Sequence, residues 1–380
     1  MRHQTADLWP AGLCPAAGSA SLQAAVRTGP SPGTPFPSSM GPRCLWGCLG
    51  AFFSFALLWV LLLLLLLLLT QDAQKMQQAS DCPHADHQEP SGTAALTHSR
   101  VDWRFLFQGD FPEPRCTPGQ VLLILVTSAP GNAERRRAIR RTWAAQAQPP
   151  PPYPWQVVFL VGWSLSKMTI GQVQQEQRAF GDILLGGYLD TYRNLTLKVL
   201  HGLKWSVERC RPSFILKTDD DCFVNTDWLP EFLVKRHPLE HDLLYAGSVF
   251  PPEKRQVIRH PTSKWYVSRE DYPASEYPPY ASGVGYLLSL RATRLVLWAA
   301  EQVRPIPVED AYIGILAWHT GLQLTPSTRF AKQNAQWHLC NYRYLFVIHH
   351  VSATEQEAAT QSMREAHTSC RGNPQVSRWK

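Results

Sequence analysis

Three consecutive carboxylates lie between two apolar runs of the sequence. Asp219, Asp220 and Asp221 follow the segment "FILKT" and precede Phe223 and Val224. Carboxylates repel one another, and partial burial removes the water that would screen them. Oxygen ligands at this density suit hard cations such as Mg²⁺ or Mn²⁺. Phosphate oxygens often complete such a site, so the run predicts a substrate that carries a nucleotide.

A second acidic pair opens the apolar segment "VEDAYIGILAW" with Glu309 and Asp310. Carboxylates at the start of a helix complement its dipole, which is the structural explanation. The functional explanation is a general base close to the metal. Local sequence leaves both open.

Aromatic and small residues precede this pair. The segment 277–290, "YPPYASGVGYLLSL", contains Gly283 and Gly285, which would let a sugar or a backbone approach closely. Trp265 and Tyr266 add flat faces on which sugars pack. A bulged strand and an aromatic core explain the same residues without a ligand.

Two histidines end the segment "CNYRYLFVIHH". His349 and His350 follow an apolar run, where an imidazole would be a nitrogen ligand for the metal. A histidine exposed at the end of a strand is the other interpretation.

These residues need a scaffold that brings them together, and the alternation of apolar runs with amphipathic segments predicts one. Strands are expected in "GQVLLILVTSAP", "WQVVFLVGW", "ILLGGYLDTYRN" and "SFILKTDDD", and helices in "GNAERRRAIRRTWAAQA", "GQVQQEQRAFGD" and "LTLKVLHGLKWSVERC". The order predicts an α/β, Rossmann-like sheet. Ligands bind such sheets at the carboxyl ends of the strands, where the acidic run lies.

An uncharged stretch at residues 45–69 predicts a membrane anchor. As a helix it would be about 37 Å long, enough for a tilted crossing and too long for the core of a signal peptide. We expect a disordered cytosolic tail at 1–44, in which Met40 is an alternative start, and a luminal stem at 70–115. The sequon at Asn194, "NLT", predicts N-glycosylation and fits a luminal body.

Nine cysteines and a net charge of +7 narrow the class of protein further. The six cysteines after the anchor form no C-x-x-C pair, so disulfides in an oxidising lumen are favoured over zinc. The basic residues occur in short groups, which does not indicate a nucleic-acid partner.

Taken together, these stretches resemble the β1,3-galactosyltransferase and β1,3-N-acetylglucosaminyltransferase family of type II Golgi membrane enzymes. The matching motifs run in family order through residues 116–370 and are "RRRAIRRTW", "FLVG", "GDIL", "DTYRNLTLK", "FILKTDDDCFVN", "SKWYVSREDYP", "YPPYASGVGYLLS", "VEDAYIG" and "CNYRYLFVIHH".

The resemblance implies a GT-A fold at 116–370, with a Rossmann-like nucleotide half, an acceptor half and a short tail at 371–380. It also implies a UDP-sugar donor bound through Mn²⁺. The galactosyltransferase branch is favoured by "KTD", by the Ser282-Gly283 pair and by "ED". The acceptor would be a terminal GlcNAc or GalNAc on a glycoprotein or glycolipid.

Residue roles follow from the resemblance combined with local chemistry. Asp221, supported by Asp219, would hold Mn²⁺, with His349 as a further ligand. On the donor side, Asp220 would contact ribose or galactose, and Asp219 is a further candidate. Arg137 and Arg140 are candidates for the nucleotide, with surface charge as their alternative explanation.

Asp310 is the expected general base, acting on the acceptor 3-hydroxyl with inversion at the donor carbon. Glu309 would orient this base or bind the acceptor. Trp265, Tyr280 and Gly283 are assigned to the acceptor.

Some positions depart from the family pattern. Galactosyltransferases of this kind usually have cysteines where Ala281 and Leu316 stand, and both are absent here. Cys222 occupies a position that is usually aliphatic, so a free buried thiol is one expectation. An N-acetylglucosaminyltransferase, and an inactive Golgi scaffold or glycan-binding module, are the alternative functions.

Overall fold

A computed structural model describes residues 106, 111–145, 152–236, 243–334 and 337–370 of the chain. The predicted tail at 1–44, the anchor at 45–69 and most of the stem at 70–115 lie outside these ranges. Within them, none of the helices combines the length and the apolar character needed to cross a membrane.

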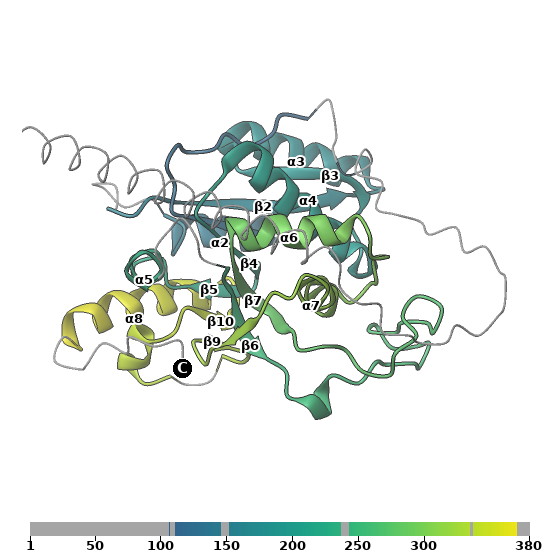
Figure 1. Ribbon diagram of the computed structural model, residues 1–380. Coiled ribbons are helices and arrows are strands. Elements are labelled where there is room, and N and C mark those ends of the chain that lie inside the picture. Colours follow the sequence, from purple (N-terminus) through teal and green to yellow (C-terminus); the bar gives the residue numbers. More distant parts are fainter. Residues whose placement is uncertain (1–105, 107–110, 146–151, 237–242, 335–336, 371–380) are drawn as a thin grey trace, which may run out of the picture. The chain divides into compact units, whose positions relative to one another are not determined.

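A seven-stranded sheet with the order β3-β2-β1-β4-β7-β6-β8 forms the centre of the described part (Figure 1). The strands are β1 (Leu122–Thr127), β2 (Trp155–Trp163), β3 (Ile183–Leu189), β4 (Phe214–Asp219), β6 (Tyr245–Val249), β7 (Ala281–Ser289) and β8 (Leu324–Pro326). Neighbours among β3, β2, β1 and β4 are parallel, whereas β7 is antiparallel to β4 and β6. The four predicted strands and the α/β class are confirmed.

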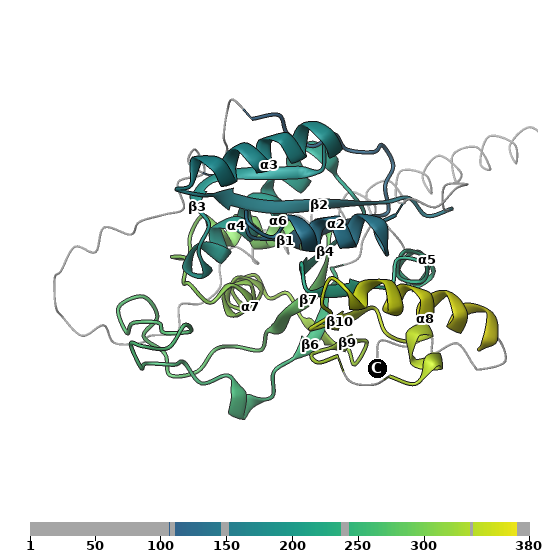
Figure 2. The ribbon, with the colours of Figure 1, turned by 180° about the vertical axis from the view of Figure 1, so that it is seen from behind.

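Helices cover both faces of this sheet (Figures 1 and 2). One buried cluster joins one face to α4 (Leu195–Trp205), α6 (Leu290–Ala300) and α7 (Glu309–His319). The other cluster includes residues of α2 (Ala133–Arg141), α3 (Lys167–Phe180), α5 (Leu229–Arg236) and α8 (Glu355–Ser369). Because β1 is buried on both faces, its sequence reads as a continuous apolar run and not as an alternation.

A second sheet has three short strands in the order β5-β10-β9. These are β5 (Cys222–Val224), β10 (Val347–His349) and β9 (Phe330–Ala331). Strand β5 begins directly after the acidic run and pairs antiparallel with β10, so that His349 is opposite Cys222. This pairing brings the C-terminal histidines to the carboxylates.

The helix predicted at 171–182 has different ends in the structure. It begins at Lys167, where the Ser166 side chain accepts a hydrogen bond from the Thr169 amide, and it ends at Phe180. Gly181 follows with φ +67°, a left-handed conformation that glycine adopts without strain. The hydroxyl cap and the glycine stop therefore set the length of α3.

Four 3₁₀ or π segments complete the helical elements of the described residues. They are η2 (Tyr192–Asn194), the π segment η3 (Ser206–Cys210), η4 (Pro252–Lys254) and η5 (Leu339–Arg343). The predicted helix at 195–210 is thus an α-helix to Trp205 that continues as a π turn.

Candidate active site

The first carboxylate of the acidic run, Asp219, is bound by side chains of β1 and β4. Strands β1 and β4 are in register with Thr127 opposite Asp219. The Thr127 hydroxyl donates to Oδ1 of Asp219, and Nζ of Lys217 donates to the same oxygen at 2.8 Å. A hydroxyl and an ammonium therefore compensate this carboxylate within the protein.

The second carboxylate is the most buried of the three, with Asp220 6% exposed. Its Oδ2 accepts hydrogen bonds from Ser128 at 2.7 Å and Asn132 at 2.8 Å, and its Oδ1 from Arg135 at 3.0 Å. These donors come from the segment that leads into α2 and from α2 itself. Asp220 thus fixes the start of α2, and its predicted contact with the donor sugar stays a prediction.

Asp221 faces His349 at the end of β10 and the adjacent His350. Its Oδ1 lies 3.4 Å from Nε2 of His349, and one ligand atom each from Asp221, His349 and His350 lie within 4.8 Å of one another. A carboxylate and two imidazoles are ligands that Mn²⁺ accepts. The three residues therefore fit a divalent cation, whereas Asp219 is not part of this group.

The surroundings of His349 present Nε2 to this group. Nδ1 lies 3.2 Å from the Lys332 carbonyl oxygen, and donation from Nδ1–H leaves the Nε2 lone pair for a metal. Burial alone would lower the pKa of His349, but the hydrogen bond and charge of Asp221 raise it. Burial alone would raise the pKa of Asp221. The hydrogen bond and charge of His349 and the charge of Arg135 outweigh this effect, so the pKa of Asp221 is lowered.

His350 was not among the predicted ligands. Successive side chains of a strand point to opposite faces, so a His-His pair at a strand end is expected to supply one ligand only. His350 has φ +62°, which interrupts that alternation, and its ring lies 3.9 Å from that of His349. The His-His pair in the sequence was a signal that His350 could be a ligand, but the backbone conformation that turns it toward Asp221 could not be predicted from the sequence.

The Glu309–Asp310 pair forms the first turn of α7, as the structural explanation requires. Asp310 is half-buried, and its carboxylate accepts from the amides of Gly283 and Ala311, both at 2.9 Å. A Cβ on Gly283 would lie 3.3 Å from Oδ2 of Asp310, so this glycine allows the close approach. Burial raises the pKa of Asp310, against the lowering effects of the Gly283 amide and Lys217.

Glu309 points into the protein and is 3% exposed. Its carboxylate accepts from the Tyr286 hydroxyl at 2.5 Å and lies 3.5 Å from Nζ of Lys217. Burial raises the pKa of Glu309 to about 7, although Lys217 opposes the shift. At this depth Glu309 is placed to orient its neighbours, and direct acceptor contact has no support from its exposure.

Lys217 connects the two acidic motifs. Its side chain is 1% exposed, and Nζ contacts Asp219, Glu309 and, at 2.7 Å, the Gly283 carbonyl oxygen. The same Gly283 residue donates its amide to Asp310. One buried ammonium thus links the acidic run at the end of β4 to the start of α7.

The two predicted acceptor aromatics differ in accessibility. Trp265 is 45% exposed, whereas Tyr280 is 6% exposed and packs on Phe250 with ring centroids 5.0 Å apart. Burial and the charge of Asp310 raise the pKa of Tyr280. Tyr280 therefore lines the surroundings of Asp310 from within, and Trp265 is the more accessible of the two.

The structure does not bring the two predicted donor arginines to this site. Arg137 is 57% exposed and lies 3.6 Å from Glu134 one turn away. Arg140 forms ion pairs with Glu176 and Asp182, each at 2.7 Å. Their role in nucleotide binding stays a prediction that this geometry does not favour.

Arg135 occupies the place that those two were expected to fill. Its guanidinium lies 3.0 Å from Asp220 and 3.7 Å from Asp221, and 43% of the side chain is exposed. The run "RRR" signalled an arginine at the site, but only the helical rotation of α2 decides which one faces the carboxylates.

The predicted sequon lies at the start of α4. Asn194 is half-buried, and its Nδ2 donates to the Leu189 carbonyl oxygen at 2.9 Å. Thr196 is buried and donates to the carbonyl oxygen of Ile306 at 2.7 Å. Glycosylation of Asn194 stays a prediction.

Disulfides are present, as expected. They join Cys116 to Cys210 and Cys340 to Cys370. Cys222 is a free thiol buried beside the acidic run, with Sγ 3.4 Å from the Val284 carbonyl oxygen. The expectation of a free buried thiol at this position is confirmed.

Comparison with known proteins shows which proteins this chain resembles. A family model described as Galactosyltransferase matches residues 134–328. Human beta-1,3-galactosyltransferase 1 is 31% identical over 251 residues, which are 66% of this chain and 76% of the relative. Gorilla beta-1,3-galactosyltransferase 5 is 33% identical over 234 residues, 60% and 77% of the two chains.

Solved structures are more distant. The galactosyltransferase LgtC in complex with donor and acceptor sugar analogs has a TM-score of 0.34 at 12% identity, covering 64% of this chain and 95% of LgtC. A similarity at this level carries no argument about the site.

Proposed function

Because the chain belongs to the galactosyltransferase family, we propose that it transfers galactose from UDP-galactose to the 3-hydroxyl of a terminal sugar, with inversion. The observation that carries this proposal is the link through Lys217. It joins a run of carboxylates beside a candidate cation-binding group to a half-buried carboxylate at the start of α7. Such an arrangement suits transfer from a diphosphate donor to a hydroxyl. We propose a GT-A fold for residues 116–370 on the same grounds.

On the donor side, Asp221, His349 and His350 would hold Mn²⁺. When bound, the ion supplies a positive charge that stabilises the diphosphate as a leaving group. Arg135 would add a second positive charge, because its guanidinium is half-exposed at the same carboxylates. Asp219 would not contact the ion and would be a positioning residue, because its carboxylate is bonded to Thr127 and Lys217.

On the acceptor side, Asp310 would be the general base. The acceptor oxygen attacks the anomeric carbon of galactose, and the bond from that carbon to the β-phosphate oxygen breaks. UDP leaves with the bonding electrons, and the carboxylate of Asp310 takes the proton of the hydroxyl. The amides of Gly283 and Ala311 hold that carboxylate in one orientation. Attack opposite the leaving group gives the β1,3 linkage.

The choice of galactose rests on the family motifs and not on contacts. Thr218 is fully buried and donates to the Val284 carbonyl oxygen at 2.9 Å, and Ser282 is 5% exposed. Neither side chain is open to a donor. Their influence on donor choice would therefore pass through the packing of β4 against β7.

The cellular location is part of the proposal. The disulfides indicate an oxidising compartment of the secretory pathway. Together with the anchor predicted at 45–69, they support a single-pass type II protein of the Golgi membrane with a luminal catalytic body.

A donor-by-acceptor screen tests the function. The full chain in detergent, with Mn²⁺, is offered UDP-galactose or UDP-GlcNAc and a panel of β-linked GlcNAc and GalNAc glycosides. We expect galactose transfer, with the β1,3 linkage identified by NMR. Preference for UDP-GlcNAc would assign the chain to the N-acetylglucosaminyltransferase branch. Glycan binding with neither transfer nor UDP release would support a binding module.

A further inference from the structure

We infer that the acceptor carries a negatively charged substituent, a sulfate or a carboxylate, close to the sugar that receives galactose, and that Lys264 binds it. This inference rests on the transferase function proposed above and names the substrate class of the same site. The carrying observation is an ammonium held between two aromatic rings, one of which directly precedes α4, a helix that packs on α7.

Two rings fix the position of the Lys264 ammonium. Nζ lies 4.5 Å from the ring centroid of Trp265 and 5.3 Å from that of Tyr192. Tyr192 belongs to η2 and Lys264 to the long segment before β7, so the contact joins two distant parts of the chain. Cation–π contacts of this kind restrain a side chain that would otherwise move freely in water. The charge is thus presented at a defined place.

One of the two rings belongs to a segment that packs on the residues before the proposed base. Thr196, four residues after Tyr192, donates at 2.7 Å to the carbonyl oxygen of Ile306, four residues before Asp310. The charge of Asp310 adds to burial in raising the pKa of Tyr192 to about 12. Tyr192 and Trp265 are 42% and 45% exposed. An acceptor that presents its hydroxyl to Asp310 would therefore pack beside these rings.

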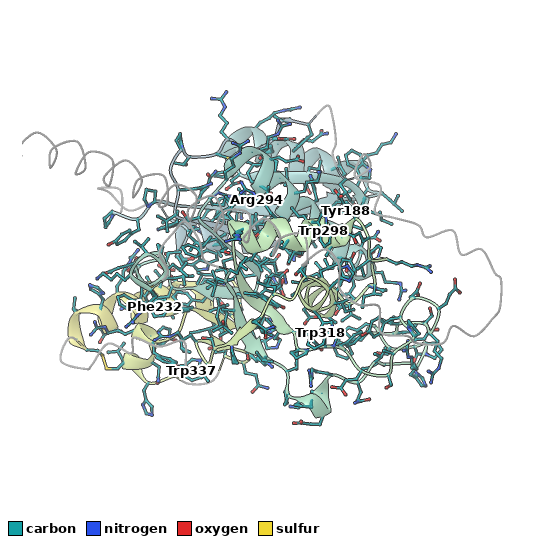
Figure 3. All side chains as sticks on the ribbon, viewed as in Figure 1. Tyr188, Phe232, Arg294, Trp298, Trp318 and Trp337 are labelled. Carbon is teal, nitrogen blue, oxygen red and sulfur yellow. A yellow bond between two sulfur atoms is a disulfide. The ribbon has the colours of Figure 1, made fainter. Side chains whose placement is uncertain are left out.

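Lys264 has no acidic partner in the part of the chain that the structure describes, where no carboxylate lies within ion-pair distance of it. A lysine that served only solubility would not need two rings to hold it. Two other tryptophans are exposed, Trp298 on α6 and Trp318 on α7 (Figure 3). Among the described cations, none is held over either ring. Among the exposed tryptophans of the described residues, Trp265 is the one with a cation over its ring.

An aromatic face with an adjacent fixed ammonium suits a charged sugar. The rings pack on the apolar face of a pyranose, and the ammonium donates to anionic oxygens. A neutral acceptor would use the rings alone. The charge of Lys264 would therefore add selectivity, since charge complementarity discriminates between partners.

A second ring-bound lysine provides a contrast. Nζ of Lys332 lies 3.7 Å from the ring centroid of Phe250, but its backbone oxygen accepts from His349. Lys332 therefore contacts both the candidate metal group, through His349, and the surroundings of Asp310, through Phe250, which packs on Tyr280. Loss of its charge should affect every acceptor equally.

The test compares Lys264→Met, Lys332→Met and the control Lys167→Met, an exposed lysine at the start of α3. Three acceptors are used: a β-GlcNAc glycoside, its 6-O-sulfated form, and a disaccharide of GlcNAc on glucuronic acid. We expect wild type and Lys167→Met to prefer the anionic acceptors. Lys264→Met should lower kcat/KM for these by about fivefold and leave the neutral acceptor unchanged. Lys332→Met should lower all three.

Binding of the same three acceptors, measured by calorimetry with UDP and Mn²⁺, separates the possible failures. Galactose transfer without a preference, or a preference that Lys264→Met retains, would overturn the inference and leave the proposed function intact. Absence of transfer to every acceptor, without binding of anionic acceptors through Lys264, would contradict both the proposed function and the inference. Absence of transfer with such binding would support the inference alone. The sulfated and carboxylated arms show which anion is recognised. Unchanged thermal unfolding of Lys264→Met excludes a folding defect.

Discussion

Three neighbouring aspartates have three different surroundings. Asp219 is compensated by Lys217 from its own strand, and Asp220 by the donors that precede α2 together with Arg135. Asp221 faces the histidines. The electrostatic difficulty of consecutive carboxylates is thus resolved separately for each one. Asp221 alone of the three belongs to the group that fits a divalent cation.

At the same scale, Asp310→Asn should abolish galactose transfer while UDP binding persists. The amide keeps the shape of the side chain and removes its capacity to take a proton, so we expect kcat to fall by about 10²- to 10⁴-fold. Transfer is measured by product formation, and UDP binding by calorimetry with Mn²⁺. Asp227→Asn, an exposed residue after β5, is the matched control. Near-normal turnover of Asp310→Asn would remove it from the role of base.

Glu309 should make stability depend on pH. Its pKa is raised from 4.5 to about 7, first by burial, so the folded state retains a proton that the unfolded chain releases. The free energy of unfolding should therefore fall as the pH rises from 4.5 to about 7, by at most about 1.4 kcal/mol per pH unit. Urea unfolding across this range measures the slope. Glu309→Gln should flatten it, and an equal slope in wild type and variant would refute the assignment.

At the scale of elements, the pairing of β5 with β10 builds the candidate metal group. Asp221 immediately precedes β5, and its carbonyl oxygen accepts from the Val351 amide at 2.9 Å just beyond β10. Backbone hydrogen bonds thus fix the spacing between the carboxylate and the histidines. A bound cation would connect two segments that are far apart in the sequence.

Removal of ligands should therefore remove Mn²⁺-dependent UDP binding. We expect Asp221→Ala, His349→Ala and His350→Ala each to weaken it by about tenfold or more, measured by calorimetry with and without Mn²⁺. Cys222→Ala is the control, because its thiol is buried and points to the Val284 carbonyl oxygen. Unchanged affinity in His350→Ala would limit the group to the other two residues.

The packing of α2 on α3 gives Arg140 a structural role. Arg140 and Arg136 share Glu176, and Arg140 also binds Asp182. Arg140→Met should lower the free energy of unfolding by about 2 kcal/mol, less than for a fully buried pair because these groups are partly exposed. Denaturant unfolding measures it. UDP affinity should stay at the wild-type value, and a clear loss would restore Arg140 to the donor site.

For the whole described body, the disulfides hold distant segments together. The Cys116–Cys210 bond joins the segment before β1 to the end of η3, across 94 residues, and Cys340–Cys370 ties η5 to the end of α8. Replacing Cys116 and Cys210 by serine should lower the free energy of unfolding by about 2–5 kcal/mol. The prediction is checked by comparing the thermal unfolding of this variant with that of wild type and of Cys222→Ala. Equal stability of all three would contradict the prediction.

The sequence by itself determined the strands, the acidic run at the end of β4 and the acidic start of α7, because these depend on local periodicity and composition. The tertiary structure decided which side chains meet. Lys217 reaches Glu309 only because β4 pairs with β7 and α7 packs beside them, and Arg135 replaces Arg137 and Arg140 through the rotation of α2. His350 turns toward Asp221 through a backbone conformation that no residue pattern announced. These contacts join residues far apart in the chain, so packing and not local preference fixes them.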